Sequence, residues 1–243
     1  MTMISPLCHD DLAARIKEKG IPVLLLDTCS ILDIVRAPVR EQISVRDIEA
    51  VHTLLDRTIG LNRQVSLVVT KQVFTEFQEH LDEVTQECDR HIIKASENHI
   101  GILERMKALS PSSVNLLPAV DLASFGFPEK SRCLAEKIVT ASLVLNDETD
   151  ELRSKAYRRS AGAKPPAKKG KDSIKDCLII ESYFRLGRIL KNNKLPCRIV
   201  FITSNKHDYE KSSHLHPDLK EEFNSVDLEY SPNWSAARHK LDR

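Results

Sequence analysis

Acidic side chains follow short apolar runs at several well-separated places in this 243-residue sequence. Asp27 ends the run at residues 21–26, in which five of six residues are apolar. Such a run is too short for a core helix and is typical of a buried strand. Because ligands gather at the carboxyl ends of strands in open α/β sheets, Asp27 is the first candidate for chemistry. The alternative is that Asp27 caps the following helix, although Ser30 could supply that cap instead.

A second acid, Glu76, follows a second apolar and β-branched run at residues 65–69. Thr70 comes directly after this run and is a plausible N-cap for a long helix over residues 71–109. Glu76 falls two turns into that helix, between two phenylalanines. It should therefore lie on or beside the face turned toward the sheet, where an unpaired carboxylate is costly.

Two further groups of polar side chains come late in the chain. Asp172 and Asp176 are four residues apart at the start of a predicted helix, so they should be neighbours on one side of it. Like charges at that spacing repel, which indicates a nearby cation; the alternative is that Asp172 caps the helix and Asp176 benefits from its dipole. Asn205 and Asp208 follow another apolar run, residues 198–203.

In a parallel sheet, all of these positions lie along one edge. Four or five carboxylates cannot stay charged and close without a compensating cation, and all-oxygen ligands select Mg²⁺ or Mn²⁺. Two such ions about 4 Å apart, or one ion with a positioned base, could activate water and stabilise the attacking and leaving oxygens of an in-line phosphodiester displacement. Hydrolysis leaving a 5′-phosphate would follow, without a histidine, cysteine or serine nucleophile.

The elements that must position these acids predict an α/β fold. Strands at residues 21–26, 65–69, 198–203 and 226–230 alternate with helices, which is typical of a three-layer α/β/α domain with a mostly parallel sheet. Residues 110–128 should form a loop, and helices are expected over 129–145 and, capped by Asn146 or Asp147, over 147–159. We place residues 1–243 in one domain, with a helical insertion at about 83–159 and a basic loop at about 160–171.

The charge balance is close to neutral, with 36 Lys and Arg against 35 Asp and Glu, so a nucleic-acid partner needs a local basic patch. Residues 153–171 hold eight Lys or Arg and no acid. Their second half should be a mobile, extended loop. Such a run is more often a solvated linker, but its position before Asp172 favours phosphate contact by Lys168, Lys169 and Lys171.

Other compositional features exclude several classes of protein. The six cysteines form no Cys-x-x-Cys pair, so reduced thiols are expected. No apolar run approaches the roughly 20 residues of a membrane helix, and the first 11 residues do not resemble a signal peptide. We therefore expect a cytoplasmic protein with no membrane partner. His207, His214 and His216 beside Asp208 and Asp218 could suggest zinc, but a solvated loop is preferred because no helix or hairpin is expected there.

Four motifs occur in the order Leu-Leu-Leu-Asp-Thr-Cys-Ser, Val-Val-Thr-x₅-Glu-Phe, Asp-x₃-Asp-Cys-Leu-Ile-Ile-Glu and Phe-Ile-Thr-Ser-Asn-Lys-His-Asp-Tyr. Each motif alone is weak, but together and in this order they resemble the PIN-domain family of metal-dependent ribonucleases. The resemblance covers residues 21–36, 65–77 and 172–209. It implies that Asp27, Glu76 and Asp176 are the catalytic, metal-binding acids.

The resemblance has two departures. Asn205 stands where the family commonly has an acid, so a second metal would depend on Asp208 or Asp172. The chain is also much longer than the compact PIN toxins and is similar to larger, stand-alone bacterial members, so no antitoxin partner is assumed and a homodimer is allowed. RNA is the implied substrate, and Thr28, Ser30 and Ser204 beside the acids are assigned to binding it.

Two functions other than a metal-dependent ribonuclease are considered. A haloacid-dehalogenase-like phosphatase would need Asp-x-Asp at the first strand, and Cys29 stands at the second of those positions. A catalytically inactive RNA-binding or scaffold protein would keep the fold and lose turnover; the retained acids argue against it, although affinity for metal does not prove catalysis.

Overall fold

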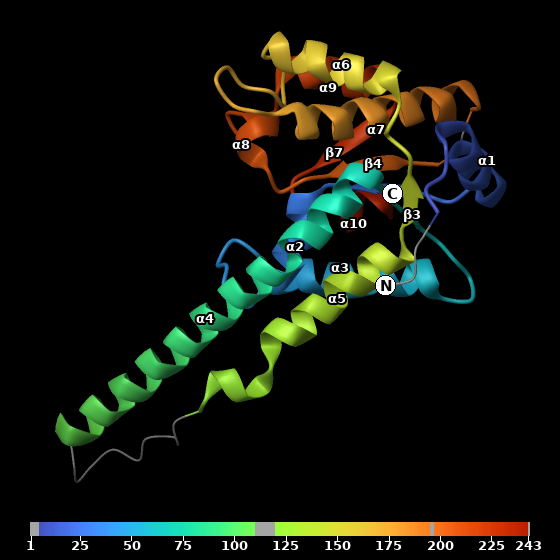
Figure 1. Cartoon of the computed structure of the whole chain (residues 1–243). Helices are drawn as coiled ribbons and strands as arrows, with labels where there is room; N and C mark the ends of the chain where they lie inside the picture. The colour runs from blue at the N-terminus through green and yellow to red at the C-terminus, as the bar shows by residue number, and fades with distance from the viewer. Residues whose placement is uncertain (1–4, 110–119, 195–196, 243) are drawn as a thin grey trace.

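A single parallel sheet forms the centre of the computed structural model, which describes residues 5–109, 120–194 and 197–242. Its strand order is β3-β2-β1-β4-β7 (Figure 1). The strands are β1 (Val23–Leu26), β2 (Ser66–Thr70), β3 (Leu143–Leu145), β4 (Ile199–Ile202) and β7 (Leu228–Ser231). β1 pairs with β2 on one side and β4 on the other, so the strand that precedes Asp27 is the central one.

Helices cover both faces of the sheet (Figure 1). One face carries α1 (His9–Lys19), α6 (Asp150–Ala161), α7 (Ile174–Asn192) and α9 (Pro217–Ser225). The other carries α2 (Thr28–Arg36), α3 (Val45–Ile59), α5 (Phe127–Ala141) and α10 (Trp234–Leu241). A short helix α8 (Lys206–Tyr209) and a hairpin of β5 (Glu210–Lys211) and β6 (His214–Leu215) follow β4. The predicted three-layer α/β/α fold is confirmed.

The long helix α4 (Lys71–Leu109) has the predicted bounds. Thr70 is its cap, since the Thr70 hydroxyl accepts a hydrogen bond from the Val73 amide at 3.1 Å. At 1.5 Å per residue, 39 residues span about 58 Å, which is longer than the sheet needs. The second half of α4 accordingly extends away from the sheet, beside the 3₁₀ helix η1 (Leu122–Phe125) and α5 (Figure 1).

The structure corrects the expected helix over residues 129–145. Helix α5 ends at Ala141, Ser142 is extended, and Leu143–Leu145 form β3, which pairs with β2. Because three apolar residues can continue a helical period as easily as form a strand, the pattern could not separate the two. The free edge of β2 decides between them. The range 83–159, expected to be helical, therefore contributes one strand of the central sheet.

Two neighbouring expectations also change. Helix α6 begins at Asp150 and is capped by Thr149, whose side chain accepts from the Leu152 amide at 3.3 Å, so neither Asn146 nor Asp147 is the cap. In the expected loop at 110–128, residues 110–119 lie outside the described residues, and the rest includes η1 and the start of α5.

The core holds β1 rigidly in place. Leu24, Leu25 and Leu26 are fully buried, and the Tyr183 hydroxyl of α7 donates to the Leu26 carbonyl at 2.6 Å. A close-packed core of this kind fixes the position of the residue that follows the strand. Among the described residues, the helices include none that is long and apolar enough to cross a membrane. All six cysteines are free thiols.

Candidate active site

Asp27 lies at the carboxyl end of β1, and its side chain does not cap the helix that follows. The residue is 2% exposed, and its Oδ2 accepts a hydrogen bond from the Thr203 hydroxyl at 2.6 Å. Asp27 is in the N-cap position of α2 but makes no side-chain cap bond. Ser30 is not the cap either, because α2 begins at Thr28 and includes Ser30 in its first turn. The Asp27 carboxylate is therefore not used as a helix cap.

Glu76 reaches the same region from the second turn of α4. Its Oε2 accepts from the Thr28 hydroxyl at 2.6 Å, and its Oε1 accepts from the Gln72 amide group at 2.9 Å. Thr28 is the residue directly after Asp27, so the bond ties Glu76 to the end of β1. Thr28, expected at the substrate, thus positions an acid in this structure.

Asp176 in the first turn of α7 is the third acid of the cluster. Its pKa is raised to about 6, chiefly by burial; Lys171 acts in the opposite direction, and the negative charges of Asp208 and Glu76 add to the rise. Burial likewise raises the pKa of Asp27 to about 7, with contributions from the negative charges of Asp176 and Glu76. Each carboxylate therefore experiences the field of the others, as expected for acids gathered at one sheet edge.

Asp208 is held differently from these three acids. Its side chain is fully buried, and Lys171 and Lys168 pair with it at 2.5 and 3.1 Å. The Asn205 amide group also donates to it at 2.9 Å. Although burial acts to raise the Asp208 pKa, hydrogen bonds from Lys171, Asn205 and Lys168 lower it below the ordinary value. Asp208 is thus an ionised partner for two lysines.

Asp172 stands at the margin of the site. It is exposed and lies outside α7, which begins at Ile174, so the expected pair on one helix face is not formed. Its Oδ1 accepts from the Ile174 amide at 3.2 Å, and its charge contributes to the raised pKa of Asp176.

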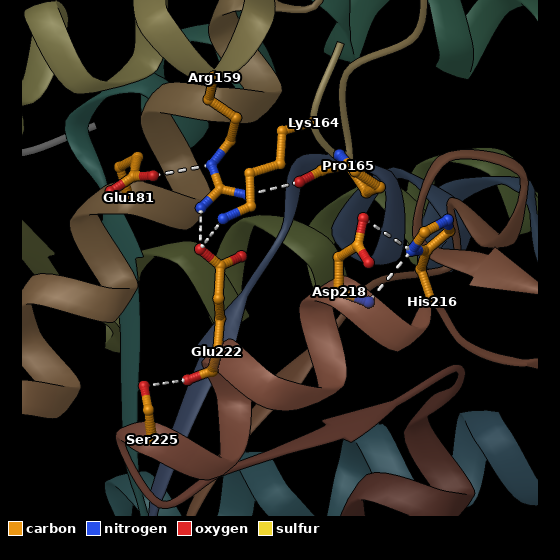
Figure 2. A network of polar contacts seen from close by, with 8 residues as sticks. All are labelled: Arg159, Lys164, Pro165, Glu181, His216, Asp218, Glu222 and Ser225. Carbon is orange, nitrogen blue, oxygen red and sulfur yellow. Dashed lines mark hydrogen bonds and ion pairs between the residues drawn. The ribbon is translucent and has the colours of Figure 1, made fainter. Parts of the chain in front are cut away.

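The basic loop is folded against the domain, contrary to the expected extended loop. Pro166 and Ala167 are buried. Arg159, which is 5% exposed, donates to the Pro165 carbonyl at 2.6 Å, to Glu181 at 2.7 Å and to Glu222 at 2.8 Å (Figure 2). These bonds join α6, α7, α9 and the loop. Lys168 and Lys171 therefore approach Asp208 from an anchored loop.

Lys169 is the exception among the three expected phosphate contacts. It is exposed, and it makes no hydrogen bond or ion pair with any residue that the structure describes. Lys168 and Lys171 are both engaged by Asp208, so Lys169 is the member of the trio whose charge is available to a ligand.

The donors of the acidic cluster have the chemistry that a hard divalent cation requires. Asp27, Glu76 and Asp176 offer only oxygen, and the pKa values of Asp27 and Asp176 are raised by burial first and by neighbouring carboxylates second. As the side chains stand, no three His, Cys, Asp or Glu residues in the described part of the chain form a group that could hold a metal ion. Thr203, Thr28 and Gln72 instead bind oxygens of Asp27 and Glu76. By its chemistry, the donor set fits a hard divalent cation such as Mg²⁺ or Mn²⁺.

The histidines considered as zinc ligands do not form a metal-binding group among the described residues either. A hairpin does form there, with His214 on β6, but no metal-binding group is present among the described residues. His216 instead accepts from the Asp218 amide at 3.3 Å at the start of α9 (Figure 2).

One acid at this edge of the sheet was not predicted from the sequence. Asp147 follows the unexpected strand β3 and is 1% exposed; its Oδ2 accepts from the Gln72 amide at 3.1 Å. Burial raises its pKa, although bonds from Gln72 and Thr70 oppose this. Asp147 thus anchors the start of α4, which presents Glu76. The signal that could have found it is an acid shortly after an apolar triplet, as at Leu26–Asp27.

The hydroxyl of Tyr209 is a second buried polar group that was not predicted from the sequence. It is fully buried, and its hydroxyl has no hydrogen-bond partner among the described residues. We expect Tyr209→Phe to leave the free energy of unfolding unchanged or to raise it by about 1 kcal/mol, because it removes an unsatisfied buried group. Denaturant unfolding measures this. Tyr183→Phe is the matched control and should lose about 1 kcal/mol, since Tyr183 bonds Leu26. A loss at Tyr209 as large as at Tyr183 would contradict the expectation.

Comparison with known proteins identifies the family of this chain. The family model described as PIN domain matches residues 24–209, which is most of the chain and runs from β1 to the end of α8. Searches of curated proteins and of solved structures found no match. PIN domains are generally nucleases that use divalent metals. On the parallel sheet, the acids at its carboxyl edge and the family match, the chain belongs to the PIN-domain family.

Proposed function

We propose that the protein is a Mg²⁺- or Mn²⁺-dependent endoribonuclease that hydrolyses RNA phosphodiester bonds and leaves 5′-phosphate ends. The observation that carries the proposal is the meeting of Asp27, Glu76 and Asp176, from three separate elements, within one another's electrostatic field. Burying like charges together is unfavourable, and a divalent cation is the counter-charge that oxygen donors select. Membership in a family of nucleases supports the same reaction class.

In this proposal Asp27 and Asp176 hold the principal ion, and Glu76 holds it or orients the attacking water. When bound, the ion lowers the pKa of water and stabilises the negative charge of the displacement. Thr203 fixes the orientation of Asp27, while Thr28 and Gln72 fix that of Glu76. Bonds of this kind set the direction of a ligand's lone pairs and are part of the site.

Asn205, Asp208 and Asp172 have supporting roles. Asp208 could reach an ion only by releasing Lys168 and Lys171, and Asp172 lies at the exposed margin. We therefore assign Asp208 to holding Lys168 and Lys171, and Asn205 to orienting Asp208, while Lys169 is left to meet the phosphates of the RNA strand. Asp172 adds negative charge near Asp176.

A cleavage assay separates this proposal from an inactive RNA-binding protein. Purified protein is incubated with end-labelled single-stranded RNA in Mg²⁺, in Mn²⁺ and in excess chelator, with DNA of the same sequence as a second substrate. We expect cleavage of RNA in either metal, none in chelator, and products that accept a ligation requiring a 5′-phosphate. RNA binding without cleavage in both metals would support the scaffold function instead.

The free charge of Lys169 gives a prediction about binding. We expect Lys169→Ala to weaken RNA binding roughly two- to fivefold and to reduce the salt slope by about 1, because one phosphate contact is lost. Fluorescence anisotropy in chelator at several salt concentrations measures both. Lys17→Ala on α1, another exposed lysine, should change neither. An unchanged slope for Lys169→Ala would remove Lys169 from the binding surface.

A further inference from the structure

A pocket of about 240 Å³ is lined in part by residues that follow β1 and β4. Helices α2 and α3, the residues after β4 and the start of α10 line it. Two of its lining residues are next to the acids' own supports. Ser30 lies three residues beyond Asp27, and Ser204 follows Thr203, whose hydroxyl holds Asp27. The pocket and the site proposed for cleavage therefore share the two segments that follow β1 and β4.

The sheet topology places this pocket where ligands bind in open α/β folds. From β1 the chain continues to β2 on one side, whereas β4 pairs with β1 on the other side. The strand order thus reverses direction between β1 and β4, and a crevice forms at the carboxyl ends of two such strands. Asp27 and Ser204 follow those two strands.

The lining contains a buried hydroxyl that lacks a partner. Ser30 is 1% exposed, and its Oγ makes no hydrogen bond within the described residues. A serine inside a helix commonly bonds the carbonyl four residues back, which here is that of Leu26. That carbonyl already accepts from the Tyr183 hydroxyl at 2.6 Å. The Ser30 hydroxyl is therefore an unsatisfied buried group in the lining of the pocket.

The size and the walls of the pocket indicate one flat ring. Its volume is below the roughly 300–1,000 Å³ of pockets for drug-sized ligands. Ile34, Ile43 and the indole of Trp234 supply apolar surface. Lys206, at the rim, is exposed and its ammonium has no partner among the described residues. Besides the Asp33–Arg40 ion pair and Asp47, the lining thus combines apolar walls, a buried hydroxyl and a cation at the rim, which match a nucleobase joined to a phosphate.

We propose that this pocket receives one nucleobase of the RNA strand, that of the nucleotide next to the phosphodiester bond cut at Asp27. The inference rests on the proposed ribonuclease function and extends it to how the strand is positioned. The base would lie between the aliphatic wall and Trp234, with Ser30 at its polar edge and Lys206 near its phosphate.

The single tryptophan of the chain is among the residues that line this pocket, so a change in its fluorescence can report on binding there. The four ribonucleoside 5′-monophosphates are titrated into the protein in chelator, with ribose 5-phosphate as the ligand that lacks a base. We expect a saturable change for at least one nucleotide and none for ribose 5-phosphate. No response to any nucleotide, or an equal response to ribose 5-phosphate, would overturn the proposal.

Two variants and a control locate the response. Ala37→Leu fills the pocket from a half-exposed position at the end of α2, and we expect it to weaken nucleotide binding at least tenfold. Ser30→Ala removes only the free hydroxyl and should weaken binding about three- to tenfold without loss of folding. Ala14→Leu on α1, exposed and remote from the pocket, should bind as the unmutated protein does. Unchanged binding by both pocket variants would contradict the proposal.

Cleavage of RNA with one abasic nucleotide separates the pocket from the reaction. We expect kcat/KM to fall about tenfold when the abasic position is next to the cut, and Ala37→Leu to add no further loss on that substrate. Full activity on the abasic RNA would overturn the pocket and leave the ribonuclease standing. A nucleotide response at Trp234 without cleavage of any RNA would support the pocket and overturn the ribonuclease.

Discussion

Asp27→Asn is expected to lower metal-dependent RNA cleavage by at least about 10³-fold, because it removes a charged ligand from the proposed metal site. The fold should survive the change, since asparagine has nearly the same volume and can still accept from the Thr203 hydroxyl. Initial rates of cleavage at saturating Mn²⁺ measure the loss, and circular dichroism checks the fold. Activity close to that of the unmutated protein would refute the assigned role of Asp27.

The same variant should be more stable than the unmutated protein when metal is absent. Burial raises the Asp27 pKa from 3.8 to about 7, so the folded state favours the protonated acid. The stability that this proton contributes is complete below the unfolded pKa and is lost as pH rises through 7. Asparagine cannot ionise. We therefore expect the stability advantage of Asp27→Asn to grow by about 2–3 kcal/mol between pH 5 and pH 8.

Chemical unfolding in chelator at the two pH values tests this expectation. Ala14→Leu on α1 is the control, because Ala14 is exposed and the change neither adds nor removes an ionisable group, so its effect should not grow with pH. Added Mn²⁺ should reverse the order at pH 8, since metal stabilises only the protein that retains its ligand. An advantage for Asp27→Asn that shrinks as pH rises would show that its carboxylate is not buried as the structure has it.

The second large effect concerns Arg159, the buried centre of the network that anchors the basic loop (Figure 2). Arg159→Met should lower the free energy of unfolding by about 3 kcal/mol. Its side chain is only 3% exposed, and its removal leaves the carboxylate of Glu181, 10% exposed, without its cation. The loss of a bond to the Pro165 carbonyl should also release the loop, which limited proteolysis near residues 162–171 would detect.

Lys164 provides a closely matched control. It contacts the same Glu222 oxygen as Arg159, at the same 2.8 Å, but its side chain is 47% exposed. Exposed ion pairs contribute little to stability, so Lys164→Met should cost less than about 1 kcal/mol. Denaturant unfolding of the two variants therefore compares the free energies lost by a buried and an exposed cation that contact the same partner at the same distance. Equal losses would show that burial does not determine the strength of this network.

Some of the site could be predicted because its signals are local. A short apolar run that ends in an acid identified both Asp27 and the strand before it, and a threonine followed by helical periodicity located Glu76 on α4. Strand burial and helix capping depend on neighbouring residues, and the sequence displays these directly. The parallel order of the strands then follows from the helices between them.

Other features depend on contacts between distant residues. The strand β3 exists because three residues pair with the free edge of β2, and Asp147 reaches the sheet edge only with it. Lys168 and Lys171 appeared as free phosphate contacts, yet the fold brings Asp208 to them from 37–40 residues away in the chain.

The sequence by itself determined the fold class and the acids at the ends of β1, in α4 and in α7, because each is marked by its own short segment. Only the tertiary structure decided which of these acids stay unpaired, which lysine is free, and where a pocket lies beside them. Charge pairing and burial are properties of groups that meet in space, and no local pattern of residues records them.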